Sequence, residues 1–168
     1  MTEDLRISPR GATIETALEK CPAFFLEEAV AATVESTMLI EREVKERTPT
    51  SGAATLRESI GAMPVVVTAH AVRGQVATSL AYAAPVEHGS KPHWAPIEPL
   101  IDWVTRKLGK RGEEAEEVAS AIRFKIAARG TEGAHMFRDG VKAAEGQVVG
   151  FYEAAAARAL ARLEEAAR

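Results

Sequence analysis

A stretch punctuated by prolines, residues 80–109, places the strongest constraint on how this chain can fold. Proline fixes its own φ angle and has no N–H, so this stretch cannot begin as a long helix or a central strand. We expect a rigid, proline-rich loop followed by a helix over residues 99–108, which Gly109 ends. Irregular loops held by their surroundings often carry binding residues. The loop is punctuated by Pro85, Pro92, Pro96 and Pro99.

A long helix is predicted over residues 22–47. Apolar side chains from Phe25 through Met38 to Val44 recur at helical spacing, and charged residues mostly fill the other positions. Pro22 suits a first helical turn, and the Thr48-Pro49 pair ends the helix. Residues 50–60 are expected to begin as a loop and then to enter a short helical or extended segment.

The next segment predicts a β-hairpin. Residues 63–73 are rich in β-branched side chains and residues 75–80 return, with Gly74 expected in the turn. Two strands alone are marginally stable in water, so the long helix is expected to cover one face of the hairpin. Further helices are predicted over residues 113–128 and from residue 141 to the end.

These segments predict an α+β fold. A long N-terminal helix packs on a small antiparallel sheet with a β-hairpin, followed by the proline-rich loop and C-terminal helices. Residues 1–12 are expected to form a flexible arm, with a short helix over 13–20, and residues 13–168 a single domain. The last helix, about 141–168, has a narrow, alanine-rich apolar face that suits packing on a neighbouring subunit.

Bulk composition narrows the function classes. The net charge of −3 gives the whole chain no strong attraction for nucleic acid. The single cysteine, Cys21, excludes an intramolecular disulfide and is expected to be a small apolar filler. The sequence contains neither an apolar run long enough to span a membrane nor an N-terminal signal core, so synthesis in the cytoplasm is expected.

Two kinds of chemistry compete with a purely structural reading. His88, His93 and Glu87 could serve a metal-dependent hydrolase, but their spacing fits no standard zinc motif, and polar loop histidines are the simpler interpretation. The basic residues between 106 and 111 could bind nucleic acid in a regulatory module, although they also suit a helix C-terminus. We therefore assign no catalytic, cofactor-binding or metal-binding residue.

The two tryptophans receive different predictions. Trp103 lies on the apolar side of its predicted helix and is expected in the core. Trp94 suits either the core or an interface, where tryptophan is enriched.

Four segments resemble one protein family in the same order along the chain. Residues 81–93, AYAAPVEHGSKPH, are similar to the "YAxxVExGTxPH" segment of minor tail-component or neck proteins of long-tailed phages. Residues 48–60 resemble "APVDTGxLRxSI" with a short insertion at Ala53-Ala54, and residues 101–108 resemble "LxxWxxRKLG". Residues 129–138 resemble "RGxxPxPFMRPA", but Gly133-Ala134-His135 replaces the proline pair and Asp139-Gly140 replaces the final Pro-Ala.

The resemblance implies a structural virion protein without catalysis. Such a protein forms a homo-oligomeric ring, expected as a hexamer, at the head–tail junction. Its partners are the head-completion or connector protein and the tail terminator, and it makes transient contact with passing DNA; no membrane is involved. The expected interface loop comprises Glu87, His88, Gly89, Lys91, Pro92, His93 and Trp94.

Overall fold

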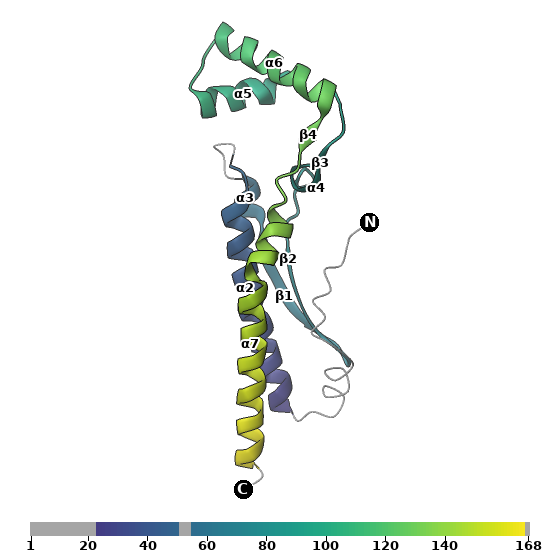
Figure 1. Ribbon diagram of the computed structural model, residues 1–168, viewed down its shortest axis with the longest axis vertical. Helices are drawn as coiled ribbons and strands as arrows, with labels where there is room; N and C mark the ends of the chain where they lie inside the picture. Colours follow the sequence, from purple (N-terminus) through teal and green to yellow (C-terminus); the bar gives the residue numbers. More distant parts are fainter. Residues whose placement is uncertain (1–22, 51–54, 167–168) are drawn as a thin grey trace. The chain divides into compact units, whose positions relative to one another are not determined.

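The computed structural model describes residues 23–50 and 55–166, with side chains up to residue 162. The fold is α+β, and the described residues include two antiparallel sheets of two strands each (Figure 1). The chain divides into two compact units. The predicted arm, the helix at 13–20, Cys21 and the insertion at Ala53-Ala54 lie outside the described residues.

The first unit comprises Met1–Leu39, Ala62–Gln75 and Glu145–Arg168. It contains most of α2 (Ala23–Arg47) and of α7 (Met136–Ala166), which run alongside each other here (Figure 1). Small side chains bring the two helices close, because the buried positions include Ala32, Ser36, Ala155 and Ala159. The hydroxyls of Thr33 and Tyr152 share a hydrogen bond of 2.8 Å across this contact.

Ion pairs border the same contact. Arg158 donates to Glu28 (2.6 Å), and Arg162 donates to both Glu28 (3.2 Å) and Glu27 (3.0 Å). The hydrogen bond from Arg158, together with that from Arg162, lowers the pKa of Glu28 below its usual range. The C-terminal helix thus packs on a helix of its own chain, and its predicted packing on a neighbouring subunit stays a prediction.

The helix predicted over residues 22–47 is confirmed as α2, but two residues of its predicted apolar stripe, Val34 and Met38, are exposed. Met38 is 64% exposed. The buried positions are Ala32, Thr33, Ser36, Thr37, Leu39, Ile40 and Val44. Threonine and serine can occupy this face because their hydroxyls donate to carbonyls one turn back, as Ser36 does to Ala32 (2.7 Å). The sequence prediction placed Thr33 and Thr37 on this face but missed Ser36, because a serine gives no apolar signal.

The predicted β-hairpin is confirmed, with a different turn. Strand β1 (Gly61–Val67) pairs with β2 (Val72–Ala77), and the turn lies at residues 68–71, where the Thr68 N–H donates to the Ala71 carbonyl (2.8 Å). Gly74 lies inside β2. A Cβ atom there would collide with the side chains of Thr37 and Thr33, so glycine is needed for close packing of β2 on α2.

The second unit comprises Ile40–Gly61 and Val76–Ala144. It contains the short helices α3 (Thr55–Ser59) and α4 (Ala83–His88), the two-residue strands β3 (Gly89–Ser90) and β4 (Thr131–Glu132), and the helices α5 (Ile97–Leu108) and α6 (Glu113–Arg129). The helices α5 and α6 form a helical hairpin around the buried side chains of Val104, Ala115 and Ala119. Gly109 ends α5 in the left-handed conformation, as predicted (φ 69°).

Two predictions about this unit are wrong. The proline-rich stretch is not irregular throughout, because α4 and β3 occupy residues 83–90. Pro85 is tolerated since it lies in the first turn of α4, where its missing N–H would have no intrahelical partner. Trp103 is 37% exposed rather than buried, because Val104 supplies the side chain that fills the core of the α5–α6 hairpin.

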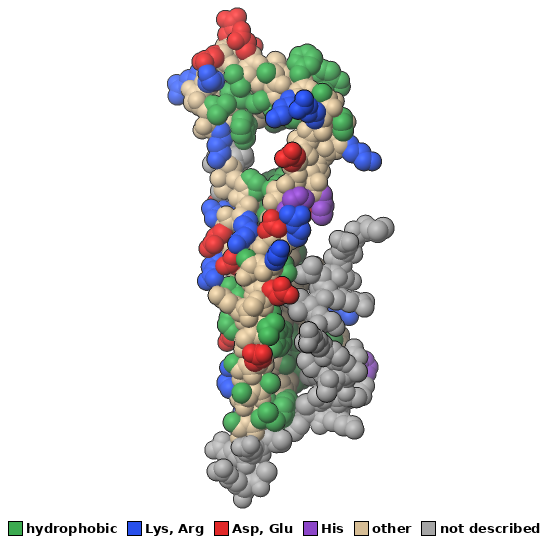
Figure 2. All heavy atoms as spheres, in the orientation of Figure 1, with side chains coloured by type: hydrophobic (Ala, Val, Ile, Leu, Met, Phe, Trp, Pro, Cys, Tyr) green, Lys and Arg blue, Asp and Glu red, His purple; other side chains and the backbone are tan. Residues whose placement is uncertain are grey.

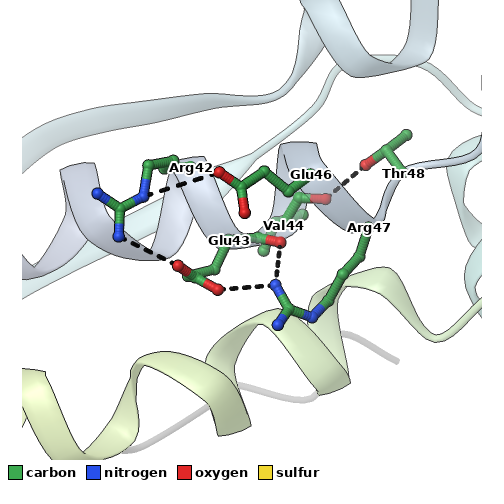
Figure 3. Close-up of polar contacts among 6 residues, drawn as sticks. All are labelled: Arg42, Glu43, Val44, Glu46, Arg47 and Thr48. Atoms are coloured by element: carbon green, nitrogen blue, oxygen red, sulfur yellow. Dashed lines mark hydrogen bonds and ion pairs between the residues drawn. The ribbon is translucent and has the colours of Figure 1, made fainter.

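The last turns of α2 are stabilised by their own side chains (Figure 3). Glu43 accepts hydrogen bonds from Arg47 (2.7 Å) and Arg42 (3.1 Å), which lower the pKa of Glu43. Thr48 donates to the Val44 carbonyl (2.7 Å) and so binds a carbonyl that the ending helix leaves free. Gly140 of α7 packs against this point, since a Cβ at residue 140 would lie 2.7 Å from Val44 Cγ2.

Candidate interface site

Two of the four segments that carry the family resemblance lie against each other in the second unit. Strands β3 and β4 pair antiparallel, with Gly89 opposite Glu132 and Ser90 opposite Thr131. The Ser90 N–H also donates to the Thr131 hydroxyl (3.0 Å). These contacts join residues about forty positions apart, so sequence spacing gave no indication of them.

Glycines allow the two segments to approach. Gly89 (φ 80°) and Gly130 (φ 72°) adopt the left-handed region that other residues resist. A Cβ at Gly89 would collide with the Thr131 carbonyl, and one at Gly130 with the Ser90 carbonyl. A Cβ at Gly133 would collide with the Glu87 carbonyl. Because these collisions involve backbone atoms, no side-chain movement could relieve them.

Glu87 ties α4 to the start of α7. Its carboxylate accepts the backbone N–H groups of Phe137 (2.9 Å) and Arg138 (3.1 Å) in the first turn of α7. The first N–H groups of a helix have no intrahelical partner, and the helix dipole favours a negative charge beside them. Glu87 is only 7% exposed, so these bonds also compensate for burying its charge. Glu87 therefore has a structural role within its own subunit, as the cap of α7.

The same junction explains why the departure from the family pattern is compatible with this fold. The N–H groups of Ala134 and His135 donate to the carbonyls of Val86 (2.8 Å) and Glu87 (3.1 Å). A proline at position 135, as in the segment it resembles, could not make the second bond. His135 has a positive φ of 51°, and Met136, which follows it, is fully buried. The backbone hydrogen bonds of Ala134 and His135 thus fix the path by which residues 133–135 enter α7.

The predicted interface residues separate into two groups. Glu87 is buried and Gly89 is half-buried at the junction just described. The exposed residues are His88, Lys91, Pro92, His93 and Trp94. His93 Nδ1 donates to the Lys91 carbonyl (2.9 Å), which holds the imidazole close to its own loop. The structure brings these side chains together on one exposed segment, and their contact with a partner stays a prediction.

Trp94 packs on the surface of α6 rather than in the core. It is 59% exposed, and its ring meets the ring of Phe124 edge-on at 5.3 Å between centroids. The guanidinium of Arg123 lies 5.0 Å from the centroid of the Trp94 ring, within the range of a cation–π interaction. Phe124 is itself 64% exposed. Of the two interpretations of Trp94, the core is excluded and a surface position remains.

Sequence reasoning missed Arg123 and Phe124, although a signal was present. The buried face of α6 is defined by Ala115, Ala119 and Ile122. At 100° per residue, Phe124 lies about 140° around the helix from Ala119, on the opposite face. A large aromatic residue outside the apolar stripe of a helix is one that the helix's own core does not bury.

The described residues offer few side chains arranged for either of the two alternative chemistries, which are metal-dependent hydrolysis and nucleic-acid binding. These residues contain no cluster of three or more histidine, cysteine, aspartate or glutamate side chains arranged to hold a metal ion. Both carboxylate oxygens of Glu87 are engaged by α7. In the basic segment, Arg106 pairs with Asp102 (3.0 Å) and Lys110 pairs with Glu114.

Among the described helices, none is long and apolar enough to cross a membrane. Comparison of the chain with family models, with curated proteins and with solved structures finds no match.

Proposed function

We propose that this chain is a structural protein of a phage neck, which assembles into a ring at the head–tail junction and lets DNA pass. The ring joins the head-completion or connector protein to the tail terminator. The proposal rests on the four segments that resemble neck proteins in order along the chain. The pairing of β3 with β4, which joins two of these segments, supports treating them as one element of the fold.

One observation carries the proposal that the chain self-associates. Among the described residues, half of the sixteen buried hydrophobic side chains are alanines, whereas twelve large hydrophobic side chains are exposed. The exposed set includes Met63, Val66 and Val67 of β1 and Val149 and Leu160 of α7. A monomer normally buries its large apolar side chains before its alanines, because the stabilisation grows with the apolar area removed from water. The apolar surface left exposed in this way is available for burial in an assembly.

Native mass spectrometry of the purified chain tests the proposal. The chain is measured alone and with the products of the genes on either side of its own. A closed multimer, expected as a hexamer, that forms alone or on adding those products supports a ring protein. A chain that stays monomeric under all these conditions contradicts it. Elemental analysis of the same sample tests the hydrolase alternative, which requires a stoichiometric metal ion.

Point substitutions are preferable to deleting the loop. A deletion of residues 80–96 would remove α4 and Glu87, so loss of assembly would report only misfolding. Substituting the exposed Lys91, His93 and Trp94 leaves the β3–β4 pair and the α7 cap intact. Virions that stay joined and infectious with these substitutions would remove the loop from the interface while leaving the ring itself in place.

A further inference from the structure

An aromatic–basic patch lies at the C-terminal half of α6, and we propose that it binds the acidic N-terminal half of α6 in a second copy of this chain. The patch consists of Trp94, Arg123 and Phe124. Two further basic residues, Lys125 and Arg129, follow it in the last turns of α6. The inference rests on the proposed self-assembly, in which these two surfaces would form the contact between subunits.

The aromatic part of the patch has the properties of a binding anchor. Trp94 and Phe124 contact each other, yet both remain more than half exposed. Arg123 lies over the Trp94 ring, and its Nε is buried without a hydrogen-bond partner within the described part of the chain. Tryptophan and arginine are the residues that most often dominate binding energy at protein interfaces. Burial of this cluster by a partner would remove exposed aromatic surface from water.

Charge complementarity identifies the occupant. Residues 118–129 contain Arg123, Lys125 and Arg129 and no acidic residue, whereas residues 113–117, EEAEE, contain four glutamates and no basic residue. Glu114 pairs with Lys110, and the structure gives no partner among the described residues to Glu113 or Glu117. Figure 2 shows acidic side chains gathered at the start of α6, and hydrophobic and basic ones near its end. The helix dipole accounts for part of this charge pattern but not for the exposed aromatic pair.

The positions of the two surfaces suit a head-to-tail contact. Glu113, Glu117 and Phe124 project from the same outer face of α6 by helical geometry, opposite the core of the α5–α6 hairpin. Their centres lie about 14 Å apart along the helix at 1.5 Å per residue, so one surface can be occupied without covering the other. Rings are built from two such different surfaces on each subunit.

Sedimentation velocity of the full chain tests the inference against matched variants. W94A/F124A removes the anchor, and W103A removes the exposed tryptophan of α5 in the same helical hairpin as a control. We expect the first variant to weaken self-association about tenfold or more, and the control to leave it unchanged.

Charge reversal then tests the partner. K125E/R129E and E113K/E117K should each weaken association, and the chain that carries all four substitutions, whose net charge equals that of the wild type, should recover it. Carbodiimide cross-linking of the wild-type chain, from a mixture of isotopically light and heavy copies, should join Lys125 of one copy to Glu113 or Glu117 of another. This measurement keeps the inference testable if a reversed variant fails to fold.

The outcomes separate this inference from the proposed function. Wild-type assembly that none of these substitutions changes would overturn the patch and leave the ring in place. An association that depends on Trp94 and Phe124 but not on the reversed charges would overturn α6 of a second copy as the occupant. A wild-type chain that never assembles, alone or with its neighbours' products, would overturn both.

Discussion

Replacing Glu87 should loosen the start of α7. Its carboxylate accepts two backbone N–H groups, from Phe137 at 2.9 Å and Arg138 at 3.1 Å, and the side chain is 7% exposed. In Glu87→Ala both N–H groups lose their acceptor in a place with little access to water. In Glu87→Gln the charge is lost and the amide NH₂ can offer no acceptor to one of the two donors.

The magnitude follows from these two bonds. A hydrogen bond to a charged group contributes about 1.5–3 kcal/mol, and loss of a helix cap costs about 0.5–2 kcal/mol. We therefore expect Glu87→Ala to lower the free energy of unfolding by about 2–4 kcal/mol and Glu87→Gln by about half of that. For a chain of this size each kcal/mol corresponds to about 2–4 °C in melting temperature, so Glu87→Ala should melt about 4–16 °C lower.

Thermal denaturation followed by circular dichroism at 222 nm measures the loss, and hydrogen exchange at the Phe137 and Arg138 amides locates it. Glu132→Gln is the matched control, since Glu132 is an exposed carboxylate of β4 in the same junction. If Glu87→Ala melted within about 1 °C of the wild type, or if those two amides exchanged no faster, the capping role would be refuted.

Two further predictions concern backbone fit and charge. Gly133→Ala should destabilise the protein, because the new Cβ would collide with the Glu87 carbonyl. Gly146→Ala in α7, where a Cβ meets nothing within 4 Å, should stabilise the protein by about 1 kcal/mol, and equal melting temperatures for the two variants would contradict this reasoning. Because Arg158 and then Arg162 lower the folded-state pKa of Glu28 below its ordinary value of 4.5, its contribution is present above pH 4.5 and is lost as the pH falls through the lowered pKa. Glu28→Gln should therefore melt below the wild type at pH 7, and the gap should close on acidification; a gap that stayed constant down to pH 2 would contradict the assignment.

Local patterns in the sequence were sufficient for most of the regular structure. The helices α2, α5 and α6 and the β-hairpin were predicted from the spacing of apolar residues and from punctuation by proline and glycine. The bounds of the three helices differ little from the prediction, whereas the turn of the hairpin lies at residues 68–71 instead of at Gly74. These signals are local, because a helix or a hairpin is specified by neighbours a few residues away. Where the local signal conflicted with packing, as at Gly74, the strand continued through the predicted turn because the missing side chain was needed against α2.

The start of α7 shows the limit of such signals. The sequence predicted a loop up to residue 135 and a helix from 141, but α7 begins at Met136. The difference comes from Glu87, almost fifty residues earlier, whose carboxylate binds the first N–H groups of the helix. No pattern within the helix itself could show a cap supplied from elsewhere in the chain.

The sequence by itself determined α2, α5 and α6, the existence of the hairpin and the exposed loop of the candidate site, since periodicity and proline placement act over short distances. Only the tertiary structure decided which parts of that site meet. It buried Glu87 as a cap, paired β3 with β4 through glycines that admit no side chain, and placed Trp94 beside Arg123 and Phe124. These decisions depend on contacts between residues far apart in the chain, whose free energies are set by packing and burial rather than by local preference.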